Sequence, residues 1–190
     1  MKTIYSVRHG RTALNDESTI IGHSDVPILN SARKEIGAIA QRLLPEHFDI
    51  ILTSDLRRAV QTAEIIQSYL KAPLIASSDL REVDYGDLVQ QPKKEVRVAY
   101  PSYHKDQFFV HPSGESFQQM YDRIVVYLDS VLREYNSLLL VTHAGCIRAL
   151  YAYCNNLDFN DVLTLPLTNN VILKCVIHPD GKKEAYFLQH

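Results

Sequence analysis

The heptapeptide SLLLVTH, residues 137–143, decides the fold class of this chain. Its centre, residues 138–141, is an uninterrupted apolar run. Strands of a parallel sheet are covered by helices on both faces and therefore read as continuous apolar runs, whereas half-exposed strands alternate. The heptapeptide therefore predicts a buried parallel strand that ends at Thr142-His143.

The segments on both sides of this strand have helical periodicity. Residues 114–135 place apolar side chains every three or four positions, and residues 144–154 return to the same pattern. Further out, strands and helices continue to alternate, with Ser54 as the expected N-cap of one helix. The other predicted strands are 2–7, 48–53, 73–77, 170–178 and 183–188, and the other predicted helices are 31–44, 54–70 and a short one at 92–100.

This alternation predicts the fold class α/β, as a three-layer α/β/α sandwich with a mostly parallel central sheet. A length of 190 residues fits a single domain over 1–190. Residues 77–116 are rich in polar and turn residues, and we expect them to be an irregular segment that covers the substrate.

Composition excludes several classes of protein. Hydrophobic residues make up 46% and the formal net charge is -2, so neither nucleic-acid binding nor membrane-surface binding is expected. The three cysteines, Cys146, Cys154 and Cys175, form no metal or disulfide pattern and predict small core residues in a reducing compartment. The longest apolar run, 149–154, is too short to span a membrane, and the N-terminus lacks a signal-peptide pattern. The expected location is cytoplasmic.

Three predicted strands end in residues suited to binding an anion. The first runs into Arg8-His9, the second into TSDLRR (53–58), and the buried strand into Thr142-His143. A turn histidine or a surface arginine is unremarkable by itself, and Arg57 competes with Arg58 for the inward position. Ligands of open α/β sheets bind beyond the carboxyl ends of the strands, so these residues are expected to meet at one rim.

Such a rim is suited to phosphoryl transfer. A neutral imidazole is a good nucleophile near pH 7, because the unperturbed pKa of histidine is about 6.5. Guanidinium groups match phosphate oxygens in charge and geometry. A helix beginning at Ala144-Gly145 adds N–H donors. The leaving oxygen also needs an acid, for which LREVDYGD (80–87) offers Glu82, Asp84 and Asp87.

Five stretches in order, VRHGRTALN, TSDLRRAVQTAEII, LREVDYGD, SGESF and VTHAGCIR, resemble the histidine phosphatase superfamily, in its phosphoglycerate mutase-like branch. The resemblance spans about residues 2–175. It implies a covalent phosphohistidine at His9 and protonation of the leaving group by Glu82. It also implies a phosphate pocket, formed by Arg8, Arg58, His143 and Asn15.

The resemblance further implies that Gly22, His23 and residues 77–116 shape the substrate side. Some positions depart from the family pattern. Ala144 replaces a glycine, and Arg11 stands where Glu or Gln is common, which places an extra cation near the mouth of the site. No metal or other cofactor is implied.

Three functions are compatible with these residues. The favoured one is a phosphomonoesterase acting on a small phosphate monoester, with α-ribazole 5'-phosphate as the specific candidate. The alternatives are a phosphoglycerate-type mutase, which the short stretch between Asp87 and Gly114 disfavours, and a non-catalytic relative that binds phosphorylated ligands. The sequence does not indicate the oligomeric state.

The remaining polar residues have simpler interpretations. Glu115 and Ser116 either begin the long helix or touch the site, and Lys93-Lys94 are interpreted as a solvated charged pair rather than a contact for a second anionic group. Among the other histidines, all except His23 are expected on the surface: His47, His104, His111, His178 and His190.

Overall fold

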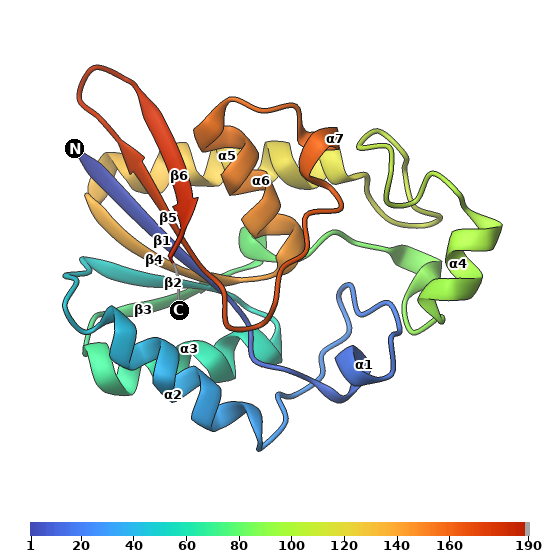
Figure 1. The fold of residues 1–190 in the computed structure, drawn as a ribbon, viewed down its shortest axis with the longest axis horizontal. Helices are drawn as coiled ribbons and strands as arrows, with labels where there is room; N and C mark the ends of the chain where they lie inside the picture. Colours follow the sequence, from blue (N-terminus) through green and yellow to red (C-terminus); the bar gives the residue numbers. More distant parts are fainter. Residues whose placement is uncertain (189–190) are drawn as a thin grey trace.

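The structure, a computed structural model that describes residues 1–188, has a six-stranded sheet between two layers of helices (Figure 1). The strand order is β3-β2-β4-β1-β5-β6. The first four of these are mutually parallel, β5 pairs antiparallel with β1, and β6 pairs antiparallel with β5, which confirms the predicted mostly parallel sandwich. The strands are β1 (Lys2–Arg8), β2 (Ile50–Ser54), β3 (Leu74–Ser77), β4 (Ser137–Thr142), β5 (Ile172–Ile177) and β6 (Lys183–Phe187).

Two pairs of long helices cover the sheet. Helices α2 (Ala32–Leu43) and α3 (Arg57–Leu70) pack on one face, and α5 (Phe117–Glu134) and α6 (Ala144–Asn155) on the other (Figure 1). The shorter elements are α1 (Ala13–Asp16), α4 (Lys93–Ala99), α7 (Phe159–Val162) and the 3₁₀ turns Ser78–Leu80 and Gly86–Leu88. The sequence analysis predicted α4 but not α1 or α7, which are too short to carry a periodic signal.

Strand β4 has the double burial that its continuous apolar run predicts. Leu138 and Leu140 belong to the core formed with α5 and α6, whereas Leu139 and Val141 belong to the core formed with α2 and α3. All four side chains are 0% exposed. Burying each one stabilises the fold by roughly 1.5–3 kcal/mol, which fixes β4 at the centre of the sheet.

Two further predictions concern the cysteines and the helices that could span a membrane. Cys146, Cys154 and Cys175 are buried and free, as the sequence predicts. Within residues 1–188, no helix combines the length and the apolar content needed to cross a bilayer.

The expected capping role of Ser54 is wrong. Ser54 is the last residue of β2, and α3 begins only at Arg57, after Leu56. The Ser54 hydroxyl accepts a hydrogen bond from the Leu56 N–H (3.3 Å), which supports the turn rather than the helix. At the start of α5, by contrast, Ser116 and Gln119 form a reciprocal capping box.

The segment of residues 77–116 lies beyond the carboxyl ends of the parallel strands, with α4 at its outer edge (Figure 1). Two of its stretches are joined by backbone hydrogen bonds just before α5, from the Asp87 N–H to the Pro112 carbonyl and from the Glu115 N–H to the Asp84 carbonyl (both 2.9 Å). A β-carbon at Gly86 (φ +49°) or at Gly114 would collide with the facing backbone. The glycines of DYGD and SGES therefore allow these two stretches to lie against each other.

Candidate active site

A cavity of about 680 Å³ opens where the strands β1, β2 and β4 end. Most of the residues that the sequence singles out line it: Arg8, His9, Asn15, Gly22, Arg58, Glu82 and Ala144. His143 is 0% exposed and lies against His9, with 5.1 Å between the ring centroids. His23 is not part of the wall and instead contacts the backbone of Glu82 from the side.

His9 is held in one orientation directly after β1. Its Nδ1 lies 2.8 Å from the carbonyl oxygen of Gly10, which can only accept a hydrogen bond, so Nδ1 carries the proton. Burial, reinforced by the charges of Arg58 and Arg8, lowers the pKa of His9 well below its usual value. The ring is therefore neutral at physiological pH and carries a free lone pair on Nε2.

Arg58, in the first turn of α3, resolves the choice between the two neighbouring arginines. It is 1% exposed and donates from its terminal nitrogens to the carbonyls of Ser24 (2.7 Å) and Gly22 (2.8 Å). Burial lowers its pKa to about 10, so the guanidinium stays charged near pH 7. Arg57 is exposed and is not part of the cavity wall.

His143 connects the arginine to β2. The Arg58 guanidinium donates to Nδ1 of His143 (3.2 Å), so in the neutral ring Nε2 carries the proton and donates to the hydroxyl of Ser54 (2.9 Å). Burial, with the charge of Arg58 next, lowers the pKa of His143 well below its usual value. Ser54, interpreted from the sequence as a helix cap, therefore orients the second histidine.

Arg8 and the backbone of His9 are held by residues that the sequence analysis missed. Arg8 donates to the carbonyl of Leu167 (2.7 Å), and the side-chain amide of Asn169 donates to the carbonyl of His9 (2.7 Å). The hydroxyl of Thr62 accepts the Gly10 N–H (2.9 Å). These contacts join residues far apart in the chain, so no local pattern signals them.

Glu82 lies at the amino end of α6. Its carboxylate oxygens accept the N–H groups of Gly145 and Val83 (both 3.1 Å), and its carbonyl accepts a hydrogen bond from Nε2 of His23 (2.7 Å). The other two candidate acids are engaged elsewhere. The carboxylate of Asp84 accepts the Gly86 N–H and that of Asp87 accepts the Ser113 hydroxyl, and neither residue lines the cavity.

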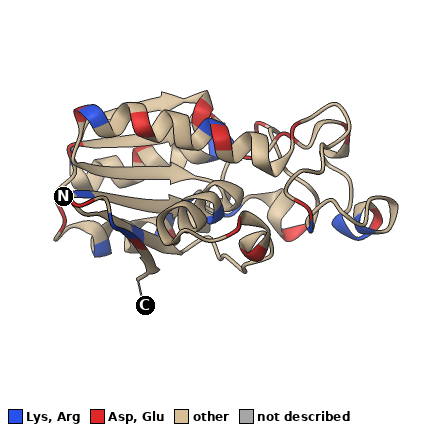
Figure 2. Ribbon diagram, turned by 90° about the horizontal axis from the view of Figure 1, so that it is seen from above, with Lys and Arg blue, Asp and Glu red and all other residues tan. Residues whose placement is uncertain are grey.

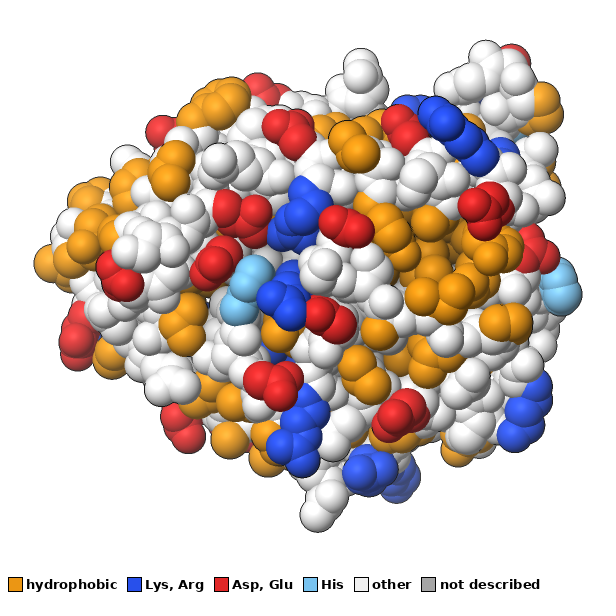
Figure 3. Space-filling view, turned by 180° about the vertical axis from the view of Figure 1, so that it is seen from behind, with side chains coloured by type: hydrophobic (Ala, Val, Ile, Leu, Met, Phe, Trp, Pro, Cys, Tyr) orange, Lys and Arg blue, Asp and Glu red, His pale blue; other side chains and the backbone are white. Residues whose placement is uncertain are grey.

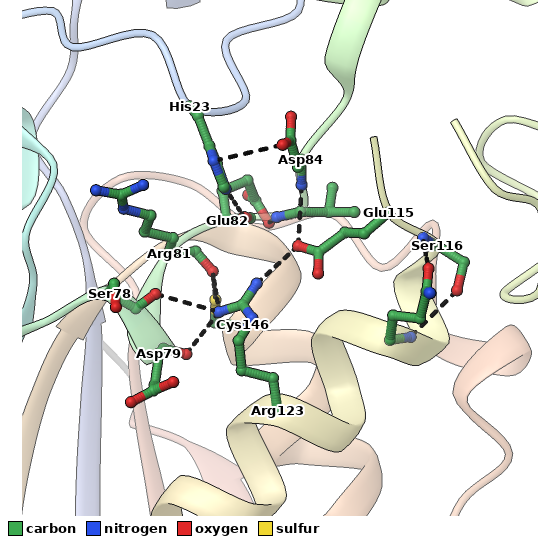
Figure 4. A network of polar contacts seen from close by, with 12 residues as sticks. His23, Ser78, Asp79, Arg81, Glu82, Asp84, Glu115, Ser116, Arg123 and Cys146 are labelled. Atoms are coloured by element: carbon green, nitrogen blue, oxygen red, sulfur yellow. Dashed lines mark hydrogen bonds and ion pairs between the residues drawn. The ribbon is translucent and has the colours of Figure 1, made fainter. Parts of the chain in front are cut away.

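Behind Glu82, α5 holds the backbone of the same loop (Figure 4). The guanidinium of Arg123 donates to the Asp79 carbonyl (2.7 Å) and to the Glu115 carboxylate (2.7 Å). The same Glu115 oxygen accepts the Asp84 N–H (3.0 Å). Glu115 therefore supports the loop that carries Glu82, and Ser116 caps α5; neither lines the cavity.

The surface position expected for His104 and His111 is wrong. His111 is 1% exposed, and His104 lies in the cavity wall with its Nε2 3.0 Å from the hydroxyl of Tyr85. Both rings pack on Phe117, because residues 100–112 fold back over the start of α5. Burial lowers the pKa of His104 to about 3. His47 and His178 are at least partly exposed, and His190 lies outside the described residues.

Two basic residues, Arg11 and Lys93, lie in positions that differ from those predicted. Arg11 is exposed, forms an ion pair with Asp16 (3.2 Å) and is absent from the cavity wall. Lys94 is exposed, as expected for a solvated residue, but Lys93 is half-buried and lines the cavity. The interpretation of Lys93 as a solvated residue is therefore wrong.

The buried histidines make folding sensitive to mild acid. Burial lowers the pKa values of His9, His104, His111 and His143, so the unfolded chain binds more protons than the folded one below pH about 6.5. Their stabilising contribution is complete above that pH and is lost as the pH falls. We expect the free energy of unfolding to decrease between pH 7 and pH 5, by up to about 1.4 kcal/mol per histidine per pH unit.

Urea denaturation at pH 7, 6 and 5 measures this decrease. Titration of Asp55 does not contribute to this decrease. The hydrogen bond from Arg81 lowers the pKa of Asp55, so the stability that this ion pair gives to the fold is lost only in stronger acid. Equal unfolding free energies at pH 7 and pH 5 would contradict the prediction.

Two curated proteins are similar in sequence to most of this chain. The uncharacterized phosphatase PhoE of Bacillus subtilis (strain 168) is 32% identical over 152 residues, covering 79% of this chain and 76% of that protein. Phosphoglycerate mutase-like protein 4 of Arabidopsis thaliana is 35% identical over 158 residues, covering 78% and 69%.

Solved structures share the fold over almost the whole length. A mycobacterial glucosyl-3-phosphoglycerate phosphatase superposes with a TM-score of 0.85 at 22% identity, covering 98% of this chain and 97% of that one. The α-ribazole phosphatase of Shigella flexneri also gives 0.85 at 22% identity, covering 99% and 96%. The model of the histidine phosphatase superfamily (branch 1) matches residues 4–187. The chain therefore belongs to the histidine phosphatase superfamily, branch 1.

Proposed function

We propose that this protein is a phosphomonoesterase that hydrolyses a small phosphate monoester through a phosphohistidine at His9. The observation that carries the proposal is the state of His9: a buried, neutral ring whose Nδ1–H is bound to the Gly10 carbonyl, which leaves Nε2 unprotonated beside two arginines. A histidine in this state is a nucleophile rather than an acid.

In the first step, Nε2 of His9 forms a bond to phosphorus while the ester P–O bond breaks. Arg8 and Arg58 stabilise the charge on the phosphoryl oxygens, since both are held by backbone carbonyls and a guanidinium group is not deprotonated at neutral pH. The ring of His143 lies against His9 and adds a fixed polar group next to the phosphoryl group. Asn15 and the backbone N–H groups that follow His143 complete the phosphate pocket. Glu82 donates a proton to the leaving oxygen.

In the second step, water attacks the phosphohistidine. Glu82, now a carboxylate, accepts a proton from that water, and orthophosphate leaves as the bond between phosphorus and His9 breaks. The charge needed at phosphorus comes from the arginines, so we expect no dependence on a metal ion. We also propose that residues 1–190 act as one domain, in which residues 77–116 cover the substrate.

The proposed substrates are small molecules. α-Ribazole 5'-phosphate is one candidate, supported by the resemblance in sequence pattern. Phosphorylated acids are a second candidate, supported by the relatives named phosphoglycerate mutase-like protein and glucosyl-3-phosphoglycerate phosphatase.

The test is hydrolysis of p-nitrophenyl phosphate in EDTA between pH 5 and pH 8, followed by acid- and base-quenching of the enzyme with labelled substrate. We expect turnover in EDTA and a protein-bound phosphate that is labile in acid and stable in base. Turnover that requires a divalent metal, or a bound phosphate that survives acid, would refute the mechanism. Transfer to a second hydroxyl without release of orthophosphate would identify a mutase.

Arg123 provides a separate prediction about the loop that carries Glu82. Replacing it with glutamine removes the donors to the Asp79 carbonyl and the Glu115 carboxylate, so Glu82 loses its fixed position. We expect kcat for an alkyl phosphate to fall about tenfold with little change in KM, and stability to fall by about 1–3 kcal/mol. Steady-state kinetics and urea denaturation measure the two effects.

Arg133→Gln is the matched control, because Arg133 is an exposed arginine in the last turn of the same helix. It should leave both quantities close to wild type. Partial recovery of kcat in Arg123→Lys would support the positioning role. A variant that loses stability but keeps wild-type kcat would limit Arg123 to a structural role.

A further inference from the structure

The cavity contains far more positive charge than a single phosphate requires. Its described wall has one acidic residue, Glu82, against six basic ones: Arg8, Arg58, Lys93, Arg97, Lys105 and Arg148. The chain as a whole has a net charge of -2, so this excess is local. A focused field of one sign in a cavity attracts ligands of the opposite sign.

Five of the six basic residues form two sets, and the sixth, Lys105, lies in the segment that follows α4. Arg8 and Arg58 lie next to His9 and serve the phosphoryl group. Lys93 and Arg97 belong instead to α4, the helix at the outer edge of the molecule (Figures 1 and 2), and Arg148 belongs to α6. The second set is thus supplied by two elements that both contribute to the cavity wall.

Lys93 and Arg97 lie four positions apart in α4 and therefore share a face. Like charges at this spacing destabilise a helix unless an anion lies between them. Lys93 is half-buried, and its pKa is lowered by burial and then by the charges of Arg8, Arg97 and Arg148, which line the same cavity. No hydrogen bond or ion pair of the Lys93 ammonium occurs within residues 1–188.

Arg148 is oriented by the rest of the fold. Its Nε donates to the Leu165 carbonyl (2.9 Å), which fixes the guanidinium plane while the terminal nitrogens have no partner in the described part of the chain. Some arginines outside the cavity wall form ion pairs instead. Arg81 forms an ion pair with Asp55, and on the face seen from behind the central basic side chains lie among acidic ones (Figure 3).

We propose that Lys93, Arg97 and Arg148 form a second anion subsite, so that the preferred substrate carries a carboxylate or a second phosphate in addition to the scissile phosphate ester. This inference rests on the proposed function and narrows its substrate class. It favours phosphorylated acids and bisphosphates over α-ribazole 5'-phosphate, whose base is uncharged.

The test compares pairs of esters that differ in one anionic group. 3-Phosphoglycerate and glycerol 3-phosphate differ in a carboxylate, and fructose 1,6-bisphosphate and fructose 6-phosphate differ in a second phosphate. Release of orthophosphate is measured for all four, with p-nitrophenyl phosphate as a reference. We expect kcat/KM to be at least about tenfold higher for the member with the extra anion in one pair, and the responding pair identifies the anion.

Substitutions of the subsite residues test whether they cause the preference for the ester with the extra anion. Lys93→Met and Arg148→Met should each reduce the ratio of the two kcat/KM values toward one, whereas Lys94→Met, at the neighbouring exposed lysine, should keep it. Lys93 lies on a short outer helix, so its variant remains informative if Arg148→Met fails to fold.

Two results would overturn the subsite. Turnover of p-nitrophenyl phosphate with ratios near one in both pairs would do so while leaving the phosphatase function intact, as would ratios unchanged in Lys93→Met. Absence of orthophosphate release from all five esters would refute the proposed function itself, and the subsite with it.

Discussion

Replacing His9 with alanine should lower kcat by at least roughly 10⁴-fold for every phosphate monoester, because the variant has no atom to accept the phosphoryl group. Water cannot take over efficiently in the remaining pocket. The neighbouring imidazole, His143, has its Nδ1 bound to Arg58 and its Nε2–H bound to Ser54, so it offers no free lone pair. The phosphoenzyme should disappear together with turnover.

The measurement is orthophosphate release together with acid quenching of labelled enzyme. Circular dichroism at pH 7 should show an intact fold, since His9 contributes little apolar packing and its backbone contacts to Thr142 and Asn169 remain. His47→Ala, at a histidine whose side chain is 85% exposed, is the control and should keep full activity. Activity of His9→Ala within tenfold of wild type would place the nucleophile elsewhere.

Sequence reasoning was able to locate His9 because the relevant signal is local. The apolar runs of β1 and β4 identify two buried parallel strands, and parallel strands bring their carboxyl ends to one edge. The pairing of Arg8 with Thr142 in the sheet register then places His9 and His143 side by side. The two strand-end patterns, residues 2–9 and 137–143, therefore indicated where the two histidines lie, while the alternation of strands and helices along the chain indicated the fold class.

The parts that could not be predicted depend on contacts between distant segments. His104 and His111 read as surface residues, because nothing near them in sequence shows that residues 100–112 fold onto Phe117. Ser54 carries a plausible capping pattern, and its actual partner, His143, lies 89 positions away. Lys93 could not be distinguished from Lys94 until α4 placed one in the cavity wall and the other in solvent.

Converting Glu82 to glutamine should lower kcat by roughly 10²–10⁴-fold for an alkyl phosphate, whose alkoxide cannot leave without a proton. The loss should be much smaller for p-nitrophenyl phosphate, because nitrophenolate is a stable anion that needs no proton. Glutamine keeps the size of the side chain but only one of the two acceptors, because the N–H groups of Gly145 and Val83 bond to different oxygens. That lost hydrogen bond affects both substrates, whereas the lost proton affects only the alkyl phosphate. The ratio of the two losses is therefore the diagnostic quantity.

Steady-state kinetics with glycerol 3-phosphate and p-nitrophenyl phosphate measures that ratio, and equal losses for the two substrates would exclude Glu82 as the general acid.

Gly145→Ala tests the position of the Glu82 carboxylate without changing its chemistry. A β-carbon at residue 145 would collide with the Glu82 carboxylate, whose flexible end can move away at little cost in stability but only by leaving its position. This variant should therefore lose alkyl phosphate turnover preferentially, and should add little to the loss already caused by Glu82→Gln, because both changes remove the same interaction. Gly37→Ala, in α2, is the control for the glycine substitution and should leave the ratio unchanged. Additive losses in the double variant would mean that Gly145 acts on the phosphate pocket by another route than Glu82.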